Sequence, residues 1–118
     1  MTTNFTVFEY LYRDASNYKA WGAILLEGAF TPQDEAELRS QLDSGEYFIP
    51  GKVGIDALQP HIWSAGFPPN CDDHEFHEFV ELRAATAEDQ IEMSVWGRLK
   101  DLLQRFEQSH TRSTTVFR

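Results

Sequence analysis

Aromatic and β-branched residues dominate the pattern in the first part of the chain, which predicts β-structure. In segment 5–12, aromatic and β-branched residues fall on both alternating faces, so both faces of this strand are expected to be largely covered. A polar loop, 13–19, separates it from a second apolar segment, 20–30. Strands joined by so short a connection most simply pair antiparallel. Gly28 is then expected to mark a bulge or a close approach near the end of the second strand.

A helix is predicted to follow, running over 32–43. Thr31 can cap a free backbone amide, and Pro32 suits the first helical position because no donor is needed there. Leu38 and Leu42 are one turn apart and define the side of the helix that is expected to be buried. The other side is expected to be mostly solvated and carries Gln33, Glu35, Arg39 and Gln41.

Apolar residues at spacings of three and four predict a second helix, which begins after Thr86. This apolar stripe consists of Ile91, Val95, Leu99, Leu102, Leu103 and Phe106. Roughly 22 helical residues with a rise of about 1.5 Å each would extend about 33 Å, which makes this the longest element. Met93 and Trp96 fall near the edge of the stripe. The helix is therefore expected to have surplus apolar surface for a partner or a second copy of the chain.

The pattern between and around the two helices is less regular. A short strand is expected at 46–49, and the Pro- and Gly-containing stretch 52–73 is expected to be irregular. Segment 76–85 is typical of another strand, although Phe76 and Phe79, three residues apart, leave a helical alternative open.

The order of these elements predicts an α+β fold, a small antiparallel sheet packed against two helices, with a long amphipathic C-terminal helix. A chain of 118 residues is expected to form one domain, 1–118. The last segment, 110–118, has no helical pattern. It is expected either to be a flexible tail or to add an edge strand through 114–117.

Acidic residues outnumber basic ones. Nineteen Asp and Glu against ten Lys and Arg give a net charge of −9. This charge disfavours direct nucleic-acid binding, because phosphate backbones are bound by Lys and Arg. It suits a basic protein partner, or the imitation of nucleic acid in a partner's basic groove. No apolar run approaches the roughly 20 residues that span a bilayer, so no membrane partner is expected.

Cys71 is the only cysteine and cannot form an intramolecular disulfide. Together with the lack of a secretory leader pattern, this favours a cytoplasmic location. Acidic neighbours disfavour a reactive thiolate at Cys71. A glycine-rich phosphate loop and a complete nucleophile motif are also missing from the sequence. The chain is therefore expected not to be an enzyme and to require no cofactor.

The polar loop after the first strand is one candidate binding site. It offers a guanidinium, amide, phenol and ammonium groups suited to an anion or a small polar ligand, and its candidate residues are Tyr12, Arg13, Asn17, Tyr18 and Lys19. The competing interpretation is structural: Arg13 pairs with a carboxylate, and the tyrosine rings pack on the sheet. Trp63, in the later loop, is open to either local packing or a partner-binding surface.

A second candidate site lies in segment 71–78, where a thiol, two imidazoles and several carboxylates occur together. His74 and His77 would share one face of a helix and could ligate a divalent metal. In an extended strand the same spacing places them on opposite faces, where they could not hold one ion. Neither HExxH nor paired CxxC motifs are present, so ordinary surface histidines are the favoured alternative.

The run Tyr-Leu-Tyr-Arg-Asp-x-x-Asn-Tyr-Lys at 10–19 resembles a stretch found in a group of uncharacterised small acidic bacterial proteins. The likeness extends through 45–50 and 74–78, and it covers about residues 5–85. It implies a bacterial, cytoplasmic single domain and transfers no catalytic role. The C-terminal helix appears as an addition beyond the shared part and is expected to provide an oligomerisation or partner surface.

These observations favour a non-enzymatic interaction or regulatory module that binds a protein partner. A more specific version is a phage or mobile-element inhibitor, with an anti-defence role, that presents an acidic surface to a nucleic-acid-binding protein. Two alternatives belong to other classes. One is a metal-binding protein or metal-dependent enzyme that uses His74 and His77, and the other is a sensor of a small polar or anionic ligand that uses the loop 13–19.

Overall fold

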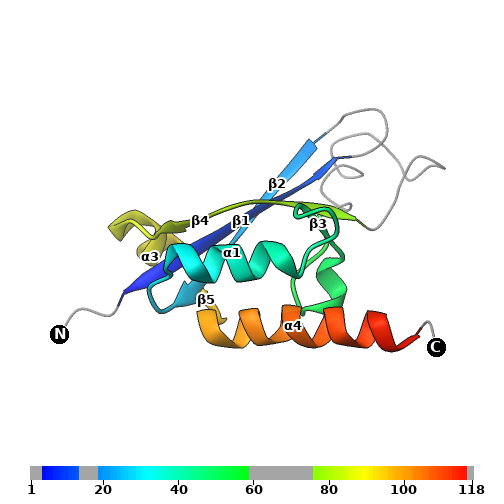
Figure 1. The fold of residues 1–118 in the computed structure, drawn as a ribbon. Coiled ribbons are helices and arrows are strands. Elements are labelled where there is room, and N and C mark those ends of the chain that lie inside the picture. Colours follow the sequence, from blue (N-terminus) through cyan, green and yellow to red (C-terminus); the bar gives the residue numbers. More distant parts are fainter. Residues whose placement is uncertain (1–3, 14–18, 59–75, 117–118) are drawn as a thin grey trace.

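The computed structural model describes residues 4–13, 19–58 and 76–116, with side chains up to residue 108 (Figure 1). These residues form a five-stranded sheet in the order β3-β4-β1-β2-β5, together with helices. The elements are β1 (Phe5–Arg13), β2 (Lys19–Glu27), α1 (Pro32–Ser40), β3 (Tyr47–Phe48), the 3-10 helix η1 (Pro50–Lys52), β4 (His77–Ala84), α3 (Ala87–Glu92), β5 (Val95–Arg98) and α4 (Leu99–Val116). The fold is α+β, as the sequence predicts.

The first two strands form the antiparallel hairpin that their short connection predicts. Their register runs from Phe5 opposite Glu27 to Arg13 opposite Lys19. Gly28 closes the open end of the hairpin in the left-handed region at φ 120°. Its N–H donates to the Asn4 carbonyl at 2.7 Å, and its own carbonyl accepts from the Thr6 hydroxyl at 2.7 Å. A Cβ at Gly28 would lie 3.7 Å from Leu99, an ordinary contact distance, so it is the positive φ rather than a close approach that favours glycine here.

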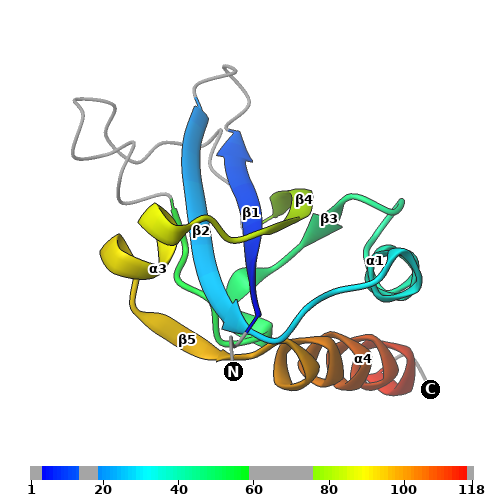
Figure 2. The same ribbon diagram turned by 90° about the vertical axis from the view of Figure 1, so that its left-hand side faces the viewer.

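One face of the sheet carries the hydrophobic core. Alternate residues of β1, namely Phe8, Tyr10 and Tyr12, point toward this face and are almost completely buried. Helices α1 and α4 run side by side over it (Figures 1 and 2). The core members from these and the neighbouring elements are Leu38, Leu42, Phe48, Val53, Ile55, Leu58, Phe79, Leu82, Leu99, Leu102 and Phe106.

Helix α1 begins as its sequence predicts. The Thr31 hydroxyl accepts from the Asp34 N–H at 3.1 Å, and the Asp34 carboxylate accepts from the Thr31 N–H at 2.9 Å. This reciprocal pair satisfies two amides that the first turn leaves without helical partners. Leu38 and Leu42 are buried, as predicted. The helix ends at Ser40, three residues before the predicted end.

The prediction of one continuous helix of roughly 22 residues after Thr86 is wrong, because the segment is divided into three elements. The segment instead forms the short helix α3, the strand β5 and then α4, which begins at Leu99. Ile91 is 84% exposed and Val95 is 50% exposed, so the apolar stripe is buried only from Leu99 onward. Ser, Val, Trp and Gly occupy positions 94–97, and such residues favour a helix only weakly. These residues form a strand rather than a helix because the strand can pair with β2.

The sheet is mixed rather than antiparallel. Strands β1, β2, β3 and β4 pair antiparallel, but β5 runs parallel to the end of β2. A third helix, α3, precedes β5 and lies away from α1 and α4 (Figure 2). The prediction of two helices therefore missed one.

The C-terminal segment also differs from its predicted form. Helix α4 continues to Val116, so residues 110–116 are helical where neither a helix nor its pattern is expected. The helix needs little apolar periodicity there because a formed helix is extended at one hydrogen bond per added residue. None of the helices among the described residues is long and apolar enough to cross a membrane.

Candidate functional site

The end of the β1–β2 hairpin holds the described members of the predicted loop site. Arg13 donates from Nε to Glu78 Oε2 at 3.0 Å, across from β1 to β4. This contact is the one that the structural interpretation of Arg13 predicts. Lys19 lies opposite Arg13 in the register and is exposed. Two cations thus face each other across the hairpin, and Glu78 compensates one of them.

Tyr12 points to the other side of the sheet from Arg13. Its side chain is fully buried in the core, and its ring centroid lies 5.1 Å from that of His77. Tyr12 therefore contributes packing rather than a surface. The remaining residues predicted for this site, Asn17, Tyr18 and Trp63, lie outside the described residues.

His77, a predicted metal ligand, is buried on the core face of β4 with no exposed surface. Its Nε2 accepts from the Leu58 N–H at 3.0 Å, so this nitrogen's lone pair is directed at the backbone. His74 lies outside the described residues, and the metal prediction stays a prediction there. Within the described ranges, no three His, Cys, Asp or Glu side chains are grouped so that they could hold a metal ion.

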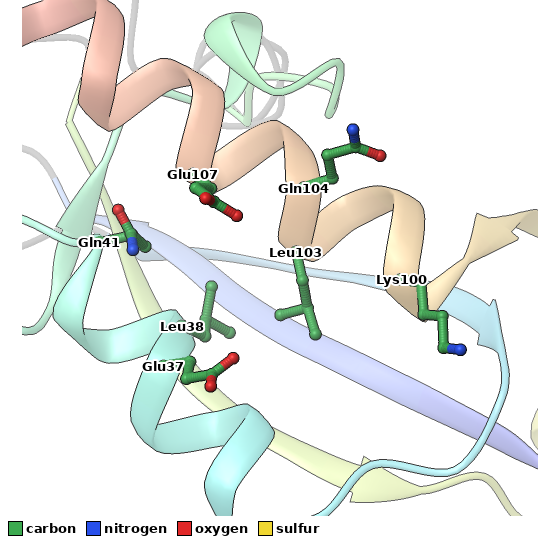
Figure 3. Close-up of a pocket in the computed structure, with 7 residues that line it drawn as sticks. All are labelled: Glu37, Leu38, Gln41, Lys100, Leu103, Gln104 and Glu107. Carbon is green, nitrogen blue, oxygen red and sulfur yellow. The ribbon is translucent and has the colours of Figure 1, made fainter.

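Helices α1 and α4 enclose a groove of about 190 Å³, which Figure 3 shows. Leu38 and Leu103 point toward each other and form its apolar floor. Polar residues from both helices form its walls: Glu37, Gln41, Lys100, Gln104 and Glu107. Gln41 and Glu107 lie toward one end of the groove, and Lys100 lies at the other. The groove thus combines an apolar base with two carboxylates, two amides and one ammonium group.

The amide oxygen of Gln41 is the unusual atom of this groove. Oε1 is buried and has no hydrogen-bond partner in the described part of the chain. A buried acceptor without a donor costs roughly 1–3 kcal/mol relative to a satisfied one. The sequence predicts Gln41 on the mostly solvated side of the helix, and this expectation is wrong for its oxygen. The error arises because one helix's pattern does not reveal which second helix packs beside it.

The carboxylates of the groove are available for further contacts. Glu37 and Glu107 are exposed, and neither forms an ion pair within the described residues. Glu37 accepts one weak bond from the Gln33 amide at 3.4 Å. Two carboxylates and an unsatisfied carbonyl oxygen are all acceptors, so the part of the groove away from Lys100 suits a donor-rich cation. Its floor suits the aliphatic stem of that cation.

The sequence contained part of the signal for this groove. Leu38 and Leu103 both belong to the predicted apolar stripes of their helices. Their meeting across the groove depends on α1 and α4 lying side by side over the same face, which is a tertiary feature.

Comparison with protein-family models, curated proteins and solved structures finds no significant match to this chain. The chemistry of the groove therefore rests on its own residues.

Proposed function

We propose that this protein is a non-enzymatic interaction module that binds a basic protein partner, with a lysine or arginine side chain of the partner seated in the α1–α4 groove. The observation that carries the proposal is the buried, unpartnered Oε1 of Gln41 beside two exposed carboxylates. The net charge of −9 supports a cationic partner, since it steers such a partner toward the protein.

A side chain with an aliphatic stem and a charged head matches the groove. The stem would cover Leu38 and Leu103, and the head would donate to Glu37, Glu107 or both. The Gln41 amide can turn its oxygen toward the head, because no hydrogen bond within the described residues holds that oxygen in place. Binding would then satisfy an acceptor that folding leaves unsatisfied.

The first test uses a defined probe, a decapeptide of alternating lysine and serine, titrated into isotopically labelled protein and followed by NMR. The double variant Glu37→Gln and Glu107→Gln should weaken binding about fivefold or more, since it removes two charge-assisted contacts. The matched control is Glu88→Gln with Glu92→Gln, two exposed residues of α3. Both doubles change the net charge equally, from −9 to −7.

The control variant distinguishes binding at the groove from attraction by the net charge of the whole protein. If both double variants weaken binding equally, the peptide responds to net charge alone and the proposed groove is refuted. Shift changes that avoid α1 and α4 would refute it as well.

A second test separates binding from folding. Gln41→Met keeps a similar volume but removes the orphaned oxygen. The variant should unfold at higher urea, by about 1 kcal/mol in the free energy of unfolding, and should bind the probe more weakly. A residue with a merely structural role would not couple greater stability to weaker binding. Unchanged affinity for the peptide would count against a role of Gln41 in binding.

A further inference from the structure

The groove between α1 and α4 has charges of opposite sign at its two ends. Gln41 and Glu107 lie toward one end, and Lys100 lies at the other (Figure 3). Lys100 is exposed and forms no ion pair within the described residues. The cation of the proposed function occupies the acidic end and leaves Lys100 without a counterpart.

Helix α4 offers Lys100 no carboxylate one turn away. The residues three and four positions from a helical residue are its neighbours on the helix surface. For Lys100 these are Trp96, Gly97, Leu103 and Gln104, and none of them is acidic. The adjacent Asp101 pairs with Arg98 instead. The Lys100 ammonium is therefore placed to meet a carboxylate that a partner brings to the groove.

The size of the groove favours the side chains of a partner over a separate small molecule. Its volume of about 190 Å³ is below the roughly 300–1,000 Å³ of typical small-molecule pockets. Its floor is apolar, because Leu38 is buried in the core and Leu103 packs against the core. A complementary occupant has a cation at the Glu107 end, an apolar side chain in the middle and an anion at the Lys100 end.

The spacing of these charges favours a helical occupant. Lys100 and Glu107 are seven residues apart on α4, which corresponds to about 10.5 Å along the helix axis. A partner helix presents residues seven positions apart on one face, with the residue at the fourth position between them. An extended strand covers a similar length in three residues, but its first and fourth side chains point to opposite faces. One face of a helix therefore matches both ends of the groove and its floor.

We propose that the partner lays a helix in the α1–α4 groove, and that one face of this helix carries a basic, an apolar and an acidic residue within one heptad. The basic residue meets Glu37 and Glu107, and the acidic residue pairs with Lys100. The apolar residue packs between them on Leu38 and Leu103. This assignment rests on the proposed function, because the cation has the same place in both. It adds an acidic residue to what the partner must present.

Two helical peptides of the same composition test the spacing. Both have an alanine background with one lysine, one leucine and one glutamate, and the same hydrocarbon staple on the far face keeps both helical. In the in-register peptide, leucine follows lysine by four positions and glutamate follows it by seven, all on one face. In the out-of-register peptide, glutamate follows lysine by five positions and lies on another face. NMR titration should give a dissociation constant about two- to fivefold lower for the in-register peptide, as one exposed ion pair provides.

Lys100→Glu and Lys19→Glu are the matched variants. Both change the net charge from −9 to −11. Lys19 is exposed and is the first residue of β2, and this end of β2 lies away from α1 and α4 (Figures 1 and 2). The preference for the in-register peptide should disappear or reverse in Lys100→Glu and persist in Lys19→Glu. The two peptides carry the same charge, so the change in net charge cancels from the ratio of their dissociation constants.

The outcomes separate this inference from the proposed function. Equal affinities of the two peptides for the unsubstituted protein overturn the helical, two-charge occupant, and so does a preference that persists in Lys100→Glu. If both peptides then still lose affinity in the Glu37→Gln and Glu107→Gln double variant, the cation site stands and only the inference falls. If that double variant binds both peptides as tightly as the unsubstituted protein, or if neither peptide binds at all, both fall.

Discussion

The Tyr10 hydroxyl donates to the carbonyl of Asp56 at 2.8 Å, although the two residues are 46 positions apart in the chain. Tyr10 is 3% exposed and lies in the middle of β1. His77 also bonds to the backbone of this segment: its Nε2 accepts from the Leu58 N–H at 3.0 Å. Two buried polar side chains of the central strands thus hold the segment 56–58 against the sheet. Their backbone partners are satisfied as buried polar groups require.

The stability of the protein should fall in alkaline solution because of Tyr10. Burial, and secondly the negative charge of Asp56, raise the pKa of Tyr10 to about 12 in the folded protein. The unfolded value is about 10. The folded state therefore favours the protonated phenol, and this contribution is fully present below pH 10 and lost as the pH rises from 10 through 12. The loss should amount to about 2–3 kcal/mol.

Urea unfolding between pH 8 and 12 measures this loss, with Tyr10→Phe as the comparison. The variant lacks the hydroxyl and should be less stable at pH 8 by about 1 kcal/mol. Its stability should then decline less between pH 10 and 12. If the two proteins lose the same stability over that range, another group is responsible for the alkaline sensitivity.

Gly22 should tolerate no side chain. A Cβ there would lie 2.8 Å from Leu58 Cδ2 and 2.9 Å from Tyr10 Cζ, because Gly22 is directly opposite Tyr10 in the hairpin. We expect Gly22→Ala to lower the free energy of unfolding by about 1–3 kcal/mol through overpacking. Gly97→Ala, in β5, is the control, since its Cβ would meet nothing within 4 Å. Thermal unfolding should separate the two variants, and equal stabilities would contradict the prediction.

The local elements of the fold could be predicted because their signals are short-range. Thr31 and Asp34 define the start of α1 within four residues, and alternation defines the β1–β2 hairpin. The segment 87–98 could not be predicted from periodicity, because Ile91 and Val95 fit an apolar stripe that the fold does not bury. The weak helix propensity of residues 94–97 was the better indicator of structure in that segment.

The candidate site was less predictable than the fold. Arg13 has a carboxylate partner, but the sequence does not identify it as Glu78, 65 residues away. Gln41 belongs by its position to the polar side of the predicted helix, yet its oxygen is buried beside the groove that residues of α1 and α4 line. Contacts between elements distant in sequence decide both cases. Such contacts depend on the order of strands and on helix placement, which single-chain patterns do not contain.

The start of α3 should be sensitive to acid. The Asp89 carboxylate accepts from Arg83 at 2.6 Å and from the Thr86 N–H at 2.9 Å. Hydrogen bonds, first from Arg83 and then from the Thr86 backbone, hold the pKa of Asp89 well below its usual range. Its stabilising contribution is therefore present above about pH 4, the ordinary Asp value, and is lost as the pH falls through the lowered pKa.

The matched control for Asp89 is Asp34, which forms the same type of cap on α1 but has no arginine partner among the residues that the structure describes. Amide exchange at pH 5 should increase more in α3 of Asp89→Asn than in α1 of Asp34→Asn. The reason is that Asp89 also holds Arg83, which in turn pairs with Glu9 at 3.0 Å. Equal changes in the two helices would show that Arg83 adds nothing to the cap.

Gly54 contacts Trp96 of β5 and Arg105 of α4. A substitution at Gly54 should lower the free energy of unfolding by more than its backbone conformation alone explains. Trp96 Nε1 donates to the Gly54 carbonyl at 3.0 Å, and the Arg105 guanidinium lies 5.1 Å from the centre of the Trp96 ring. A Cβ at Gly54 would collide with Arg105 Nη1. The arginine would have to move from the ring and lose a cation–π contact of about 0.5–1 kcal/mol.

Gly45 separates this effect from backbone strain. Its φ is 74°, close to the 78° of Gly54, but a Cβ there would meet nothing within 4 Å. Gly54→Ala should therefore be less stable than Gly45→Ala by about 0.5–1 kcal/mol in urea unfolding. In an Arg105→Ala background the two alanine variants should become equally stable, because the colliding group is gone and additivity fails only between residues in contact. A difference that persists without Arg105 would assign the cost to another neighbour.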